Sequence, residues 1–232
     1  MGTPACDGRR GRVFMAELLG TALFVLGALS AVALVRNVGE GRLALTGALV
    51  ATVVSTIAVS PVGRVSGAHL NPALTLAFRA LGRVGDRDLA GYASAQLLGA
   101  FAGGVAFRAL WGRTARAVGG GVTHPAVSTA AAVALEAAMT ALLVSVIVAC
   151  VSSARLARFA PVAIWPVLAL LIWLLAPDTG TSLNPARSAG PALAFGDLGD
   201  LWVYTLAPTA GALVAALPWL RRTRERTVQP LA

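Results

Sequence analysis

Charged residues are scarce in this sequence, and lysine does not occur in it at all. Only 12% of the 232 residues are charged, whereas 57% are hydrophobic and the mean hydropathy is +0.76. A soluble domain carries roughly 25% charged residues. The shortage of charge therefore argues against a cytoplasmic enzyme and indicates a membrane protein.

Cysteine and histidine are equally rare. Cys6 and Cys150 cannot build a disulfide framework or a metal site on their own, so we expect no metal ion and no cofactor. Two histidines are few for catalysis, and no Ser/His/Asp set, HExxH motif or paired carboxylates appear. We therefore expect that the protein is not an enzyme. The net charge of +9 does not indicate a nucleic-acid partner, because the arginines lie between apolar stretches rather than in one patch.

Six apolar stretches are long enough to cross a bilayer, which takes about 20 helical residues. The predicted spans are Val13–Val35, Leu43–Val62, Leu89–Leu110, Val127–Val151, Phe159–Ala176 and Leu201–Leu220. The first could be a cleaved signal peptide, since arginines precede it and residues 31–33 resemble a cleavage site. It is longer than the roughly 7–15 residues of such an apolar region and contains Glu17, which favours a retained span.

Arginine placement predicts the orientation of these spans. If both termini are cytoplasmic, thirteen arginines lie inside and five outside, with Arg187 considered separately. The positive-inside rule therefore predicts a multi-pass protein of the cell (inner or plasma) membrane with both termini in the cytoplasm. We divide the chain into a channel domain at 13–220 and disordered cytoplasmic tails at 1–12 and 221–232.

The two halves of the chain repeat each other. Ser66–Ala73 corresponds to Gly180–Ala186, and Tyr92-x3-Gln96-x2-Gly99 recurs as Tyr204-x3-Pro208-x2-Gly211. The first repeat covers about 13–111 and the second about 127–220. Each repeat has three spans, an odd number, so the second must enter the membrane from the opposite side, which gives an inverted repeat.

Each repeat contains an Asn-Pro pair that starts a short helix. Asn at the N-cap and Pro at the first helical position are strong start signals, and they predict half-helices at Pro72–Arg79 and Pro185–Phe195. Entering from opposite faces, these could meet near the bilayer midplane, each with about half a positive charge at its N-terminus. A water molecule could hydrogen-bond there, whereas a cation would lose its hydration facing two positive ends.

The residues before each Asn-Pro pair are rich in glycine and serine and are predicted to be irregular. Such backbone is tolerated at membrane depth only where it is buried in protein or lines a wet cavity. We expect the side-chain oxygen of Asn71 and of Asn184 to cap its own helix, with the amide N–H groups free for a permeant. The predicted wall of carbonyl acceptors consists of Gly67, Ala68, His69, Gly180, Thr181 and Ser182.

Two carboxylates lie within predicted spans, at Glu17 and Glu136. A carboxylate near mid-span costs about 2.5–3.5 kcal/mol on insertion scales, so each needs a partner. We expect both to accept hydrogen bonds from backbone N–H groups of the irregular segments and to hold those loops. A proton relay is the alternative.

The motifs resemble those of the major intrinsic protein family, the aquaporins and glycerol facilitators. They are Ala16-Glu17-x2-Gly20-Thr21, Ser66–Thr75, Tyr92-x3-Gln96-x2-Gly99-Ala100 and Leu183–Pro191. The resemblance implies an all-α membrane fold with six transmembrane helices and two re-entrant half-helices, a passive pore in each subunit, and a homotetramer. The two pore boxes it implies are Asn71, Pro72, Ala73, Asn184, Pro185 and Ala186.

The resemblance also implies a selectivity filter of four residues outside the Asn pair. Matched by spacing to the boxes, they are Ala51, Ile172, Thr181 and Arg187. Water-selective members have Phe and His at the two helical positions, so Ala and Ile there imply a wider throat. The set is most similar to nodulin-26-like channels, which pass boric, arsenous or silicic acid, glycerol and urea as well as water. A water-selective aquaporin remains an alternative, and a coupled secondary transporter a remote one.

Overall fold

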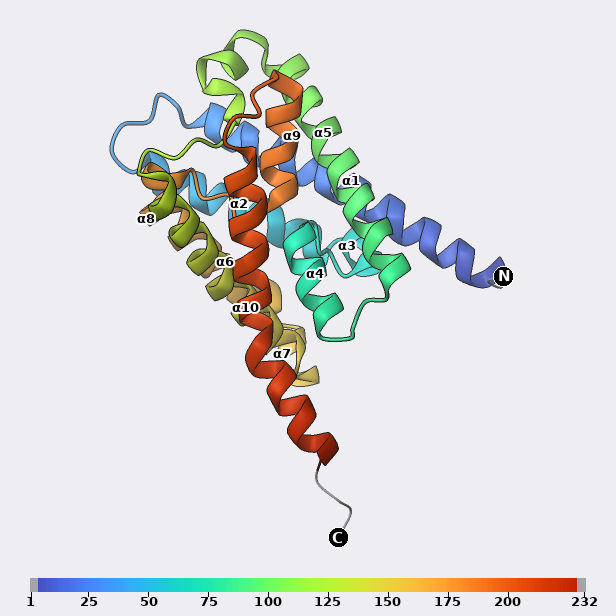
Figure 1. The fold of residues 1–232 in the computed structure, drawn as a ribbon. Helices are drawn as coiled ribbons and strands as arrows, with labels where there is room; N and C mark the ends of the chain where they lie inside the picture. The colour runs from blue at the N-terminus through green and yellow to red at the C-terminus, as the bar shows by residue number, and fades with distance from the viewer. Residues whose placement is uncertain (1–3, 229–232) are drawn as a thin grey trace.

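The computed structural model describes residues 4–228 of the chain, and Figure 1 shows the arrangement of the helices. The helices are α1 (Pro4–Leu34), α2 (Arg42–Val59), α3 (Pro61–Ser66), α4 (Pro72–Ala80), α5 (Asp86–Ala117), η1 (Gly119–Gly121), α6 (Thr129–Val151), α7 (Ala154–Ala157), α8 (Ala160–Thr179), α9 (Pro185–Phe195) and α10 (Leu201–Val228). The described residues contain no strand, so the predicted all-α class is confirmed.

All six predicted spans are confirmed as helices long and apolar enough to cross a membrane: α1, α2, α5, α6, α8 and α10. Their mean hydropathies range from 1.2 for α5 to 2.3 for α6. The protein is therefore a multi-pass membrane protein. The ends differ from the prediction by several residues in places; α5, for example, continues to Ala117 instead of Leu110.

The expectation of disordered tails is wrong wherever those tails are described. Residues 4–12 belong to α1, and residues 221–228 continue α10. Pro4 is the first residue of α1, a position where proline suits a helix. The sequence after Pro218 contains no Gly or Pro before Gln229 and is rich in arginine, a good helix former. The predictions for 1–3 and 229–232 lie outside the described residues.

The inverted repeat is visible in the helix pairing. Helix α1 packs along α5 in the first repeat, and α6 packs along α10 in the second, while α2 packs against α8 across the two halves. Each half-helix packs against the last span of the other repeat: α4 packs against α10, and α9 packs against α5. This exchange brings both half-helices into the centre of the molecule (Figure 1).

Glycines at equivalent positions permit the closest helix contacts. A Cβ at Gly99 in α5 would lie 2.3 Å from the Leu18 carbonyl oxygen of α1. A Cβ at Gly211 in α10 would lie 2.1 Å from the Ala137 carbonyl oxygen of α6. Small residues allow such backbone approach between membrane helices. Glycines at equivalent positions therefore permit close packing of α5 on α1 in the first repeat and of α10 on α6 in the second.

Candidate functional site

The two predicted half-helices start at the asparagines, as α4 and α9. The Asn71 Oδ1 atom accepts hydrogen bonds from the backbone N of Ala73 at 2.9 Å and of Leu74 at 3.4 Å. The Asn184 Oδ1 atom accepts from Ala186 N at 2.9 Å and from Arg187 N at 3.3 Å. Both side-chain oxygens are therefore occupied by capping, which leaves the amide nitrogens facing away from their own helices.

The amide nitrogens cross between the repeats. Asn71 Nδ2 donates to the Leu183 carbonyl oxygen at 2.9 Å, and Asn184 Nδ2 donates to the Leu70 carbonyl oxygen at 2.8 Å. The expectation that both N–H groups of each amide are free is therefore wrong: one of the two is used within the protein. The reason is the tip-to-tip approach of the two segments, which brings each carbonyl within reach of the opposite amide.

The segments before the asparagines have matching backbone strain. The φ angles of Ala68 and Leu70 are 50° and 52°, and those of Thr181 and Leu183 are 46° and 58°. For an L-residue, this left-handed conformation costs roughly 1–2 kcal/mol of conformational free energy. Four such residues at repeat-equivalent positions need compensating contacts. Buried carboxylates supply them at Leu70 and Leu183, whereas Ala68 N and Thr181 N donate to the nearby hydroxyl groups of Ser66 and Thr179.

Glu17 contacts the first segment. It is fully buried and accepts from His69 N at 3.0 Å, from Leu70 N at 2.8 Å and from Gln96 Nε2 at 2.7 Å. The Tyr92 hydroxyl adds a second support by donating to the Ser66 carbonyl oxygen. Gln96 belongs to the repeated motif, but the sequence alone did not indicate that it donates to the carboxylate.

Glu136 contacts the second segment in the same way. It is also fully buried and accepts from Ser182 N, Leu183 N and Thr179 Oγ1, each at 2.8 Å. The Tyr204 hydroxyl donates to the Thr179 carbonyl oxygen at 2.7 Å. In the first repeat, Gln96 is the side chain that donates to the carboxylate. The second repeat has Pro208 at the equivalent position, which has no amide donor, and Thr179 Oγ1 donates instead.

A cavity of about 640 Å³ opens on the side of α9 where η1 lies. Three of the four expected filter residues line it, namely Ile172, Thr181 and Arg187. Ala51 does not line it and is fully buried, whereas its neighbour Val50 does line it. The structure therefore brings three of the expected residues together. Helix α2 contributes not Ala51 but Arg42, Leu43, Thr46 and Val50 to the lining.

The loop between α5 and α6 completes this cavity, and its role was not apparent from the sequence. Gly119, Gly120 and Gly121 all have positive φ, between 63° and 68°. The Gly121 carbonyl accepts from Arg187 Nη1 at 3.0 Å, which fixes the half-buried guanidinium at the cavity. The only signal in the sequence was the run of three glycines.

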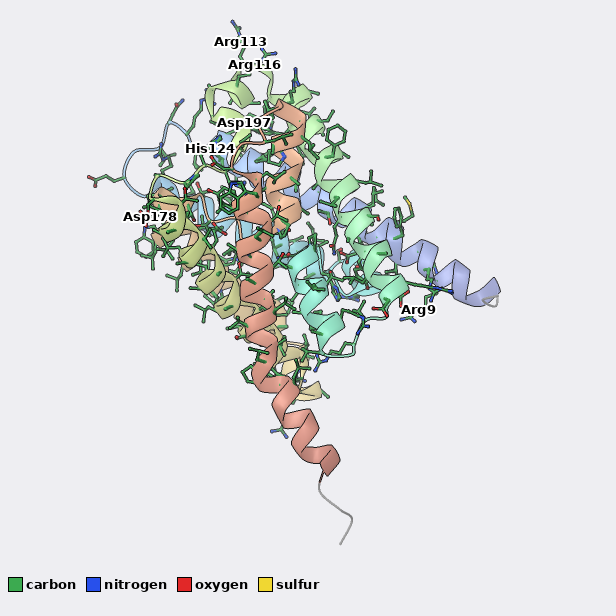
Figure 2. All side chains as sticks on the ribbon, viewed as in Figure 1. Arg9, Arg113, Arg116, His124, Asp178 and Asp197 are labelled. Atoms are coloured by element: carbon green, nitrogen blue, oxygen red, sulfur yellow. The ribbon has the colours of Figure 1, made fainter. Side chains whose placement is uncertain are left out.

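Three hydroxyl groups link this loop to α9. Ser188 Oγ lies 2.7 Å from Thr123 Oγ1 and 2.6 Å from Ser182 Oγ, and all three side chains are buried. Figure 2 shows His124 and Asp197 at the same end of the molecule; they form an ion pair of 3.2 Å when the histidine is protonated. The α5–α6 loop is thus attached to the α9 side of the cavity at several points.

The side chain of His69 is half-buried and packs against two aromatic rings. Its ring centroid lies 4.8 Å from that of Phe78 and 4.6 Å from that of Tyr92, and its Nδ1 lies 3.2 Å from Thr75 Oγ1. These contacts hold the imidazole ring between α4 and α5.

Comparison with known proteins agrees with this geometry. Residues 9–219 match the family described as major intrinsic protein. Aquaporin NIP3-1 of Oryza sativa subsp. japonica is 34% identical over 216 residues, which cover 92% of this chain and 68% of that protein. Aquaporin NIP1-4 of the same plant is 36% identical over 220 residues, which cover 93% and 79%.

One solved structure supports the fold. The X-ray structure of the aquaglyceroporin from Plasmodium falciparum superposes with a TM-score of 0.77 at 24% sequence identity, covering 90% of this chain and 95% of that one. The relatives are channels rather than enzymes. From the match over residues 9–219 and the identity to these aquaporins, the chain belongs to the major intrinsic protein family.

Proposed function

We propose that this protein is a passive channel for water and small uncharged solutes that excludes ions and protons. The observation that carries the proposal is the reciprocal pair of bonds from Asn71 to Leu183 and from Asn184 to Leu70. These two hydrogen bonds bring two helix N-termini together, each with about half a positive charge. One N–H of each amide is left for a permeant, which can exchange its bulk hydrogen bonds there at little net cost.

The proposed filter favours solutes larger than a single water molecule. Ile172 and Thr181 are small beside the rings of water-selective channels, and Arg187 supplies fixed positive charge and hydrogen-bond donors. Glycerol, urea and undissociated boric, arsenous or silicic acid fit this chemistry. The identity to NIP aquaporins agrees with that solute class; a water-selective channel is the alternative.

The remaining assignments rest on the sequence and the family. The arginine distribution supports cytoplasmic termini and a location in the cell membrane. We take residues 13–220 as the channel domain and a homotetramer as the assembly. The contacts of Glu17 and Glu136 with backbone N–H groups support a loop-holding role over a proton relay, because every such contact ends at the loop itself.

The test is stopped-flow light scattering of proteoliposomes with water, glycerol, urea and boric acid. We compare the native protein with Ala51→Phe/Ile172→His and with Val50→Phe, and use Leu45→Phe, an exposed position on α2, as control. Adding a ring at the throat should lower solute flux at least several-fold more than water flux, while Leu45→Phe changes neither.

Two results would reject the proposal. Unaltered solute flux in both ring-bearing variants would show that the filter lies elsewhere. Ionic currents through the purified protein, or uptake that saturates and depends on a proton gradient, would show that it is not a passive channel. Comparing Val50→Phe with Ala51→Phe alone also decides which of these two residues of α2 reaches the throat.

A further inference from the structure

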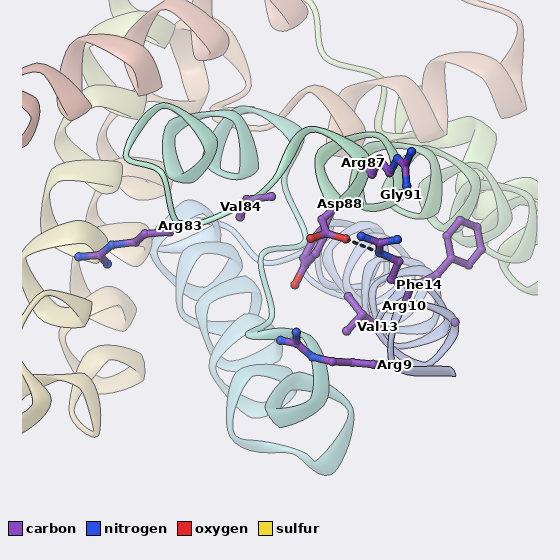
Figure 3. A pocket seen from close by; sticks show the side chains of 11 residues that line it. Arg9, Arg10, Val13, Phe14, Arg83, Val84, Arg87, Asp88 and Gly91 are labelled. Carbon is purple, nitrogen blue, oxygen red and sulfur yellow. Dashed lines mark hydrogen bonds and ion pairs between the residues drawn. The ribbon is translucent and has the colours of Figure 1, made fainter. Parts of the chain in front are cut away.

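A second cavity, of about 450 Å³, lies between the first turns of α1 and the start of α5, and its lining is separate from the pore filter (Figure 3). Arg9 and Arg10 line it from α1, and Arg87 and Asp88 line it from α5. The volume is within the range of about 300–1,000 Å³ typical of small-molecule sites. Nothing in the passage of water or solutes requires this cavity.

The cavity carries uncompensated positive charge. Four arginines line it, with Asp88 as the single carboxylate among the lining residues. Arg10 Nε donates to Asp88 Oδ1 at 3.0 Å, and Arg83 Nη2 donates to Ser152 Oγ at 2.8 Å. Arg9 and Arg87 have no hydrogen bond or ion pair with any side chain that the structure describes, so two guanidinium groups are available for an anion.

Phosphate is the anion that this arrangement suits best. A guanidinium group presents paired N–H donors in a plane and binds phosphate oxygens in a bidentate way. Figure 3 shows Arg9 and Arg87 on opposite sides of the Arg10–Asp88 pair, so an anion bound beside this pair can contact a guanidinium group from either helix. Basic pockets between transmembrane helices on the cytoplasmic side bind acidic lipid head groups by this chemistry.

The surroundings distinguish a lipid from a soluble phosphate compound. Val13, Phe14 and Val84 form an apolar part of the lining. Beyond it, the same two helices expose large apolar side chains, among them Met15 at 50% and Leu98 at 55% of their surface. A basic cavity that continues into an exposed apolar surface matches a molecule with an anionic head and hydrocarbon chains.

We propose that this cavity binds the phosphate head group of an anionic phospholipid, with the acyl chains lying along α1 and α5. The assignment of the cytoplasmic leaflet rests on the proposed orientation, whereas the head-group contact does not. The bound lipid joins the N-terminal part of α1 to the start of α5. It adds anionic contacts where, among the described side chains, the Arg10–Asp88 pair is the one ion pair between these helices.

The experiment measures phospholipid binding to the purified full chain in neutral detergent by native mass spectrometry. Phosphatidylglycerol is the probe, phosphatidylcholine has the same phosphate without net charge, and inorganic phosphate is a competitor. The variants are Arg9→Ala/Arg87→Ala and Asp88→Asn. Arg113→Ala/Arg116→Ala is the matched control, because it removes two exposed arginines near the other end of α5 (Figure 2).

Removing Arg9 and Arg87 should weaken phosphatidylglycerol binding on the order of 10- to 30-fold, since each basic group near an anionic lipid contributes about a factor of five. Asp88→Asn should strengthen it, because it frees Arg10. The control should bind like the native protein, and phosphatidylcholine should bind weakly to all. Water flux in phosphatidylcholine proteoliposomes checks that the variants are folded.

Equal binding of phosphatidylglycerol by the native protein and Arg9→Ala/Arg87→Ala would overturn the proposal. Weaker binding by Asp88→Asn would do so independently, even if the double variant did not fold. Displacement of phosphatidylglycerol by millimolar inorganic phosphate would show a site for a soluble anion rather than a lipid. Absence of water flux through the native protein would reject the proposed function alone, because lipid binding is measured without it.

Discussion

Replacing Glu136 with glutamine tests how strongly a buried carboxylate holds the second pore segment. The carboxylate accepts three hydrogen bonds of 2.8 Å, from Thr179 Oγ1, Ser182 N and Leu183 N. Glutamine has nearly the same shape but one oxygen, and it places an N–H donor where the other oxygen was. The best orientation keeps the oxygen toward Thr179 and Ser182 and points the new donor at the N–H of Leu183.

The expected cost follows from these contacts. A hydrogen bond to a charged group contributes about 1.5–3 kcal/mol, and a buried donor left unsatisfied costs about 1–3 kcal/mol. Removing a buried charge offsets part of this loss. We expect the free energy of unfolding to fall by about 3 kcal/mol, which for a chain of this size lowers the Tm by roughly 6–12 °C.

The measurement is the Tm of the purified protein in detergent, together with water flux at a temperature below both transitions. Glu17→Gln is the repeat-equivalent change and should have a similar effect, because Glu17 also accepts from two backbone N–H groups. Glu40→Gln removes one exposed carboxylate in the α1–α2 loop and should leave the Tm unchanged.

A loss below about 1 kcal/mol for Glu136→Gln would contradict this reasoning, since that is the size of one ordinary neutral hydrogen bond. It would mean that the side chain is neutral in the native protein or that Leu183 finds another acceptor. A lower Tm for Glu40→Gln would show instead that the assay reports the net charge of the chain.

Three further predictions concern the helix contacts and the pore. In Gly190→Ala the new Cβ would lie 2.3 Å from the Ala100 carbonyl oxygen, so α9 must move from α5 and the Tm should fall by several degrees; Gly199→Ala, with nothing within 4 Å, should not change it. In a background without cysteine, Thr181→Cys should make water flux sensitive to mercurials, whereas Thr205→Cys, exposed on α10, should not. Asn71→Ala removes the α4 cap and the bond to Leu183, so it should lower the Tm by more than the roughly 1 kcal/mol of a cap alone and reduce water flux.

The sequence predicted those features that depend on neighbouring residues. Apolar length alone was enough for the six spans. The Asn-Pro pairs predicted where α4 and α9 start, and α9 ends at Phe195 as expected, while α4 continues one residue further to Ala80. Capping involves residues two and three positions away, which is why the sequence contains the information.

Features that depend on the approach of distant segments could not be predicted in this way. The crossing bonds of Asn71 and Asn184 join residues 112 and 114 positions apart. Counting along α2 predicted Ala51 for the filter, but Ala51 does not line the cavity that Ile172, Thr181 and Arg187 line. Counting does not give the rotation of a helix about its axis, which depends on its neighbours. At Gly47, one turn earlier, a Cβ would lie 2.5 Å from the Ala169 carbonyl oxygen of α8, so this face of α2 is fixed by close backbone packing.

The two pore segments are stabilised from opposite sides, and each support depends on a different part of the chain. Glu17 and Glu136 bind the N–H groups of Leu70 and Leu183, while the asparagine of the opposite repeat binds the carbonyl group of the same residue. The backbone N–H and carbonyl groups of both Leu70 and Leu183 are therefore hydrogen-bonded. Because the two crossing bonds are related by the pseudo-two-fold symmetry, a shift of α4 relative to α9 that breaks one also strains the other. The two pore segments thus form one hydrogen-bonded unit made from both repeats, and neither repeat can form it alone.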